Sequence, residues 1–223
     1  MKREARWTYL AVLVGVAILA VGSPVVAADP PAAPKASTFA PAADLSAQLD
    51  AYITRLEESI KSEDEYKESA GKVAKDANTL ILIALALGVH DQDSDCQKAA
   101  PALVKAAAQL AKAKDYAAAK EGVAAVKKAA EDKSGDASAM KWQKTADLDE
   151  LMKQVPMINT RLKRNLREAN FKKKAKDNAG DAAVLAVIAQ GSMYDTEEVK
   201  NASDVGKWYG FCAQMRDAAA ALN

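Results

Sequence analysis

The fold of this chain is decided by the apolar run Leu80-Ile81-Leu82-Ile83-Ala84-Leu85-Ala86-Leu87-Gly88. A segment that is apolar on every side of a helix belongs in the centre of a helical bundle. The run has a counterpart 103 positions later, at residues 183–191, which also ends at a glycine. The pairing extends without gaps over residues 43–90 and 146–193. Self-similarity at a fixed spacing indicates a duplicated helical unit.

Composition favours helices throughout both units. Alanine makes up about a fifth of the chain and aromatic residues only 5%, and alanine is the strongest helix former. Small side chains also let helix axes approach closely. We therefore predict an all-α protein, an antiparallel helical bundle that is imperfectly duplicated. Four helices are expected in residues 44–133, and three helices related to them by duplication in residues 141–223.

The first helix of each expected unit carries an apolar stripe. In the first unit the stripe begins at Leu45 and ends at Ile60, and Asp44 is placed to cap the helix N-terminus. The next helix is expected to begin near Glu65. In the second unit Pro156 interrupts the stripe, so we expect a kink and a shift of phase at that residue.

The N-terminus predicts export. Residues 1–28 combine a basic start, an apolar stretch and the small residues Val26-Ala27-Ala28, which is the pattern of a secretory signal peptide. Residues 29–43 are rich in proline and alanine and are expected to form a linker that acts as a tether. These features predict a periplasmic or secreted protein without stable membrane insertion after cleavage. An uncleaved membrane anchor is the alternative.

Charge restricts the class of partner. The formal net charge of the chain is +1, and removing residues 1–28 takes away three positive charges and one negative charge, which leaves 1 − 3 + 1 = −1. Near-neutrality gives no electrostatic basis for binding nucleic acid. Acidic residues gather within residues 57–68 and basic residues within residues 161–176. These clusters are either solvated helix ends or complementary tips, so an envelope protein or a second copy is the expected partner.

A short segment, Lys114-Asp115-Tyr116-Ala117-Ala118-Ala119-Lys120, leads into the expected fourth helix. With export and an alanine-rich bundle, this layout resembles the cytochrome c' and cytochrome b562 type of four-helix bundle. The resemblance implies haem and a role in electron transfer or gas sensing. However, the haem attachment motif Cys-x-x-Cys-His is missing, because the last expected helix keeps only its first cysteine, Cys212. Covalently bound haem is therefore not expected.

Non-covalent haem requires axial ligands, for which His90 is the only histidine in the chain. His90 ends the apolar helix, and its position in the repeat corresponds to Met193. A His90 and Met193 ligand pair is one interpretation. The other, which we favour, is a histidine at a helix C-terminus whose charge suits the helix dipole. We therefore expect no cofactor, with haem as the alternative.

The loop after this histidine is acidic. Asp91, Asp93 and Asp95 alternate as in the first half of a calcium loop, but Cys96 stands where the turn glycine belongs and Ala102 where the closing glutamate belongs. Carboxylates are favoured at a helix N-terminus without any ion. We therefore interpret the loop as a helix cap and predict no metal site.

The two cysteines are expected in different surroundings. Cys212 lies on an apolar helix face beside Trp208 and Tyr209, whereas Cys96 lies in the acidic loop. We favour two free thiols, with a disulfide in an oxidising compartment as the alternative.

The sequence lacks the residue patterns of common enzyme active sites. The chain has a single histidine, no glycine-rich phosphate loop and no Gly-x-Ser-x-Gly motif. We predict a non-enzymatic exported bundle that serves as a structural or interaction module. The alternatives are a periplasmic haem-binding electron carrier or gas sensor, and a binder of small ligands or metal in the bundle interior.

Overall fold

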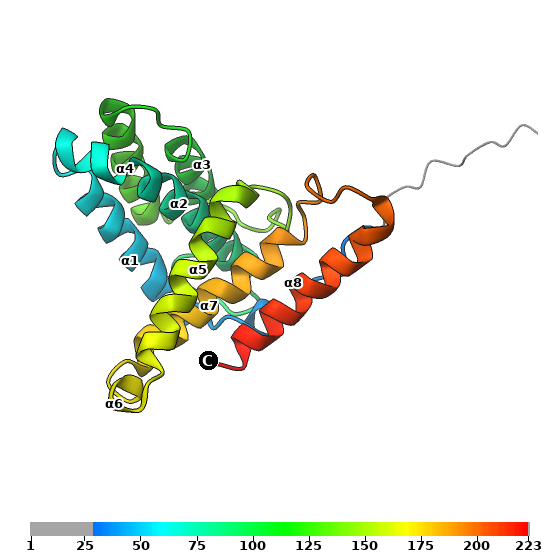
Figure 1. Ribbon diagram of the computed structural model, residues 1–223. Helices are drawn as coiled ribbons and strands as arrows, with labels where there is room; N and C mark the ends of the chain where they lie inside the picture. Colours follow the sequence, from blue (N-terminus) through cyan, green and yellow to red (C-terminus); the bar gives the residue numbers. More distant parts are fainter. Residues whose placement is uncertain (1–28, 223) are drawn as a thin grey trace, which may run out of the picture.

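The computed structural model describes residues 29–222, apart from the side chains of Glu168 and Ala169. The described residues form helices and connecting segments without any strand, which confirms the all-α prediction (Figure 1). The elements are η1 (Ala36–Thr38), α1 (Ala42–Ser59), α2 (Glu63–Gly88), α3 (Ala100–Leu110), α4 (Tyr116–Glu131), α5 (Leu148–Asn165), α6 (Glu168–Phe171), α7 (Ala175–Ser192), η2 (Ala202–Asp204) and α8 (Val205–Ala220).

Helices α1 to α4 form a four-helix bundle. Each helix packs against the next one along the chain, and α4 closes the bundle against α1. Two helices begin at side-chain caps: the Ser62 hydroxyl accepts a hydrogen bond from the backbone N–H of Glu65 (3.1 Å), and the Asp115 carboxylate accepts one from that of Ala118 (2.8 Å). Pro101 lies in the first turn of α3, where its missing N–H costs no helical hydrogen bond.

The expected cap of the first helix is wrong by a few residues. Helix α1 begins at Ala42 with Pro41 in the cap position, so Asp44 lies inside the first turn. In the first turn its negative carboxylate still interacts favourably with the positive end of the helix dipole. Helix α2 likewise begins at Glu63, two residues before the expected Glu65.

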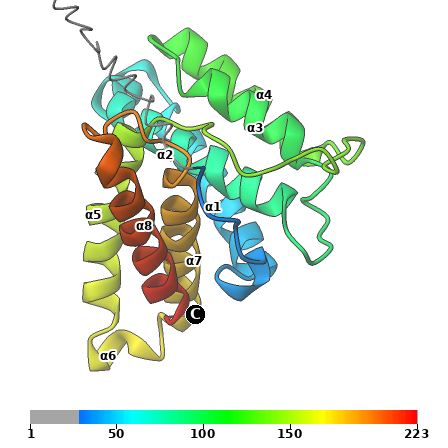
Figure 2. The same cartoon turned by 90° about the vertical axis from the view of Figure 1, so that its right-hand side faces the viewer.

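The second unit repeats three of these helices. Helix α7 packs against α5 and α8, as α2 packs against α1 and α3. In Figure 1 α7 lies between α5 and α8, and Figure 2 shows the same three helices from the side, with α8 nearest the viewer. The short helix α6, of four residues, joins α5 to α7. Within residues 29–222 no fourth long helix follows α8.

The two units share one core. Helix α1 packs against α7, and α2 packs against both α5 and α7. One hydrophobic cluster contains side chains from α1, α2, α3, α4, α5 and α7, with the apolar run of α2 at its centre. Helices α2 and α7 approach closely at Gly191, where a Cβ atom would lie 2.7 Å from Leu82 Cδ2. The two expected units are therefore parts of one packed body.

Helix α5 keeps a single phase through Pro156. Its helical assignment is continuous from Leu148 to Asn165, and the expected phase shift at the proline is wrong. The buried positions of α5 are Leu148, Leu151, Gln154, Ile158, Leu162 and Asn165. Spacings of three and four residues define one face of a helix. This face was not recognised from the sequence because a polar residue, Gln154, lies in its middle.

The N-terminal segment is only partly a tether. Ala36, Phe39 and Ala40 are buried, and η1 holds them against the body of the protein. The Phe39 ring lies 6.3 Å from the Trp142 ring, centroid to centroid, and 5.7 Å below the Arg216 guanidinium. The expectation of a linker over residues 29–43 is therefore wrong from Ala36 onward.

No helix within residues 29–222 has both the length and the apolar character needed to cross a membrane. The expected signal peptide, residues 1–28, lies outside the described residues.

Candidate functional site

His90, the candidate haem ligand, is buried at the end of α2 with 4% of its surface exposed. Its Nε2 lies 3.0 Å from the Ala40 carbonyl oxygen, and its Nδ1 accepts a hydrogen bond from the Gln92 N–H (3.1 Å). These contacts assign the proton to Nε2, which donates to the carbonyl. Both ring nitrogens therefore serve the fold, and ligation of haem would require one bond to break.

Met193, the second candidate ligand, lies in different surroundings. It packs with Val205, Tyr209 and Cys212 in a small hydrophobic cluster under α8. His90 lines a pocket of about 580 Å³ whose walls include Met140 and do not include Met193. The structure thus places the two candidate ligands in separate environments and does not bring them together on one cavity.

The acidic loop binds its own chain. The Asp91 carboxylate accepts hydrogen bonds from the Ser37 N–H (2.8 Å) and the Ser37 hydroxyl (2.6 Å), which lower the pKa of Asp91. Asp95 pairs with Lys133 at 3.5 Å. Among the described residues, no three His, Cys, Asp or Glu side chains gather in a way that would hold a metal ion. The interpretation of this loop as a cap of the next helix is wrong, because α3 has Ala99 in its cap position and no side-chain cap. Asp91 instead fastens the N-terminal segment to the end of α2.

Both cysteines are free in the structure. Cys212 is buried, and burial raises the pKa of its thiol to about 11. Cys96 is half-buried at the edge of the main core. Since the thiolate is the reactive form, we expect Cys96 to react with a disulfide reagent at pH 8 much faster than Cys212. Thiol labelling followed by peptide mass mapping tests this, with the unfolded protein as control. Equal rates in the folded protein would contradict it.

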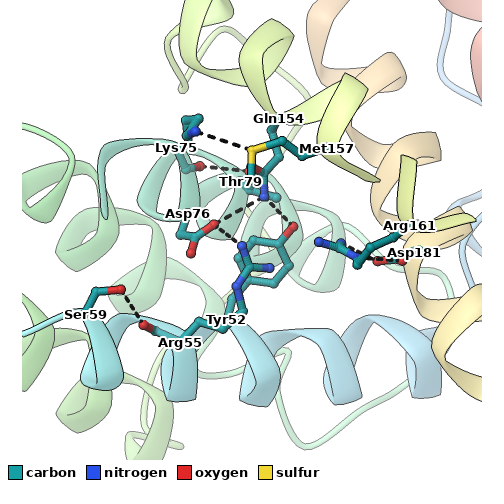
Figure 3. Close-up of polar contacts among 10 residues, drawn as sticks. All are labelled: Tyr52, Arg55, Ser59, Lys75, Asp76, Thr79, Gln154, Met157, Arg161 and Asp181. Carbon is teal, nitrogen blue, oxygen red and sulfur yellow. Dashed lines mark hydrogen bonds and ion pairs between the residues drawn. The ribbon is translucent and has the colours of Figure 1, made fainter. Parts of the chain in front are cut away.

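A buried polar network joins the two units at the centre of the molecule (Figure 3). The Tyr52 side chain of α1 and the Asp76 side chain of α2 are both fully buried. Gln154 of α5 donates from Nε2 to the Tyr52 hydroxyl (2.9 Å) and to Asp76 Oδ1 (3.2 Å). Arg55 donates to the same oxygen at 2.5 Å, and its guanidinium lies 4.4 Å above the Tyr52 ring.

Burial dominates the electrostatics of this network. It raises the pKa of Asp76, although Arg55 acts in the opposite direction, and it raises the pKa of Tyr52. Removing these groups from water disfavours their charged forms. Tyr52 and Asp76 are closed off from solvent, and only Arg55 reaches the surface, so the network links α1, α2 and α5 in the interior.

A second ion pair lies beside the network and borders a polar pocket. Arg161 of α5 donates to both carboxylate oxygens of Asp181 on α7, at 2.9 and 2.6 Å, and this contact raises the pKa of Arg161. The pocket has a volume of about 430 Å³. Its cationic side chains are Arg55, Arg161, Arg164 and Lys174, and its carboxylates are Asp177 and Asp181. Three of the four cations already bind carboxylates within the protein, since Lys174 pairs with Asp177 and Arg55 with Asp76.

An apolar groove lies between α5 and α8, with α7 as its floor. We call it the α5–α8 groove. Its volume is about 280 Å³, and its lining is largely apolar. The residues that line it include Val155 and Leu162 of α5, Leu166 directly after α5, Leu185 of α7, Met215 near the end of α8, and Leu222 after it. Leu166 and Leu222 are 37% and 45% exposed, so the groove presents apolar surface to solvent.

Sequence reasoning missed both the network and the groove. A polar residue in the middle of an apolar stripe, Gln154, was the signal for the network. The three helices expected in residues 141–223, against four in residues 44–133, were the signal for the groove. No family model, no curated protein and no solved structure matches this chain, so the comparisons provide no link to the cytochrome c' and cytochrome b562 proteins.

Proposed function

We propose that this chain is an exported, non-enzymatic helical bundle that acts as an interaction module and carries no covalently bound haem. The α5–α8 groove is the observation that supports this function. In the first unit α4 packs against α3 and α1. In the second unit the equivalent helices, α8 and α5, leave the corresponding surface open to solvent.

Sequence features support the remaining parts of the proposal. The signal-peptide pattern of residues 1–28 supports export, and the missing Cys-x-x-Cys-His motif argues against thioether-linked haem. The polar side chains that sequence reasoning singled out, His90 and Asp91, bind neighbouring parts of the chain. A binding role for the groove requires none of them.

The proposal predicts a contact at the groove in the cell envelope of the native host. A photo-crosslinking amino acid in place of Leu222 is expected to give a discrete adduct, because Leu222 lines the groove. The same amino acid in place of Phe211, which is 64% exposed on α8 outside the groove, is the matched control and is expected to give none. Gel shift and mass spectrometry of the envelope fraction provide the measurement, and the mature chain should begin near residue 29.

Two results would contradict this function. One is recovery of the chain in the cytoplasm with residues 1–28 retained. The other is the same set of adducts from both positions, or no adduct from Leu222. An absorption spectrum of the purified protein tests the haem alternative: a Soret band that is lost in His90→Ala would replace the interaction module by a haem protein.

A further inference from the structure

The register of the duplication can be taken from burial in α1 and α5. Both helices have 18 residues, and α5 begins 106 positions after α1, since 148 − 42 = 106. For this pair of helices the structural register is therefore 106, and the ungapped sequence pairing at 103 positions is wrong by three residues. At this offset the buried residues Leu45, Tyr52 and Leu56 of α1 coincide with Leu151, Ile158 and Leu162 of α5. Ser59 and Asn165, the last buried residues of the two helices, coincide as well. Residues of α1 that face α4 can therefore be assigned counterparts in α5.

One contact between α1 and α4 has an informative counterpart. Glu57 of α1 forms an ion pair with Lys127 of α4, so this flank of α1 faces α4. The residue of α5 at the same register position is Lys163, since 57 + 106 = 163. Lys163 is exposed and lines the α5–α8 groove. The charge at this position is thus the reverse of the charge in the first unit.

The side chains that line the groove also leave room for a closely packed helix. Helix α4 presents small apolar side chains to its bundle, with Ala119, Val123, Val126 and Ala129 buried. The α8 wall of the groove contributes Ala218 and Ala219, whose short side chains permit close approach of another helix. A helix in the groove would lie against Leu162, Leu185 and Met215 as α4 lies against its own neighbours.

We propose that the α5–α8 groove binds an amphipathic, alanine-rich helix of a partner protein that presents an aspartate or glutamate to Lys163. This inference rests on the proposed interaction function and identifies its partner by charge and shape. The α4 helix of a second copy fits less well. It would place Lys127 against Lys163, and in its own chain α4 is already packed against α3 and α1.

Two synthetic peptides test the charge preference directly. One has the sequence of residues 114–132, and the other carries Lys127→Glu in the same sequence. We expect the Lys127→Glu peptide to bind the full mature protein about fivefold more tightly, which is the size of a change from like charges to an exposed ion pair. In the Lys163→Glu protein the order of the two peptides should reverse. Fluorescence anisotropy of labelled peptides provides the dissociation constants.

Variants of the protein locate the binding. Leu222→Asp places a charge in the apolar groove and should weaken both peptides at least about tenfold, whereas Phe211→Asp should leave them unchanged. Circular dichroism checks that both variants keep the helical content of the original chain.

Equal affinity of the two peptides for the original protein would overturn the charge assignment and leave the interaction module intact. So would an order of affinities that Lys163→Glu does not reverse. Loss of binding in Phe211→Asp to the same extent would place the site elsewhere. If no peptide binds and no adduct forms at Leu222, both proposals fail.

Discussion

Replacing Asp76 by alanine is expected to lower the free energy of unfolding by about 3 kcal/mol, near the lower end of the range for removing one partner of a buried ion pair. The Asp76 carboxylate is the common acceptor for Arg55 and Gln154 in the interior, where water cannot replace it. Removing it takes away one of the two acceptors of the Gln154 amide and leaves one guanidinium edge without an acceptor. The effect is limited because the Arg55 side chain is 22% exposed and regains some contact with solvent. Urea unfolding followed by circular dichroism measures the change.

A matched control is available on the surface. Asp177 pairs with Lys174 at 2.9 Å, but both side chains are at least half exposed. Asp177→Ala should therefore change the free energy of unfolding by less than about 0.5 kcal/mol. A loss in Asp76→Ala as small as that in Asp177→Ala would mean that the network contributes nothing to joining the units.

The same residue gives the protein a pH dependence whose sign can be stated. Because burial raises the pKa of Asp76, the folded state binds this proton more tightly than the unfolded state does. The contribution of Asp76 to stability is greatest at low pH and falls as pH rises above the unfolded value of about 4. Asp76→Asn removes the titration, so the stability of the original chain relative to this variant should fall over that window. An increase with pH would contradict the direction.

Several helix ends in the structure lie at residues whose local chemistry marks them. The glycine at the end of the apolar run stops α2, Asp115 caps α4 and Pro101 opens α3. Each of these residues acts through its own backbone or the next turn of the helix, so the neighbouring sequence contains the information. The prediction that Asp44 caps the first helix was wrong because the helix begins three residues earlier, with Pro41 in the cap position. The fixed backbone angle of proline is compatible with a helix start.

Long-range pairing was not predictable in the same way. Arg55 and Asp76 are on different helices, and nothing in their local sequence distinguishes them from solvated charges. Their role depends on where α1, α2 and α5 meet. His90 lies at the end of α2 as expected, but its acceptor, the Ala40 carbonyl, belongs to a segment whose composition had indicated a tether. The hydrogen bonding of His90 could therefore not be predicted, because composition indicated a linker where Ala40 is in fact packed.

That region contains the last large expected effect. Phe39→Ala should lower the free energy of unfolding by about 3–5 kcal/mol, the usual cost of removing a buried phenylalanine ring. Phe39 is 2% exposed, and its ring lies against Trp142 and Arg216, on two other segments of the chain. Thermal and urea unfolding measure the loss.

Phe171→Ala makes the same chemical change at a side chain that is 53% exposed on α6, and should cost much less. A tether would make the two substitutions equal, because removing an unpacked ring from residues 29–43 leaves no cavity. A larger loss in Phe39→Ala therefore separates the two descriptions of this segment. The spacing of Ala36, Phe39 and Ala40, three and then one residue apart, is that of a single helical face.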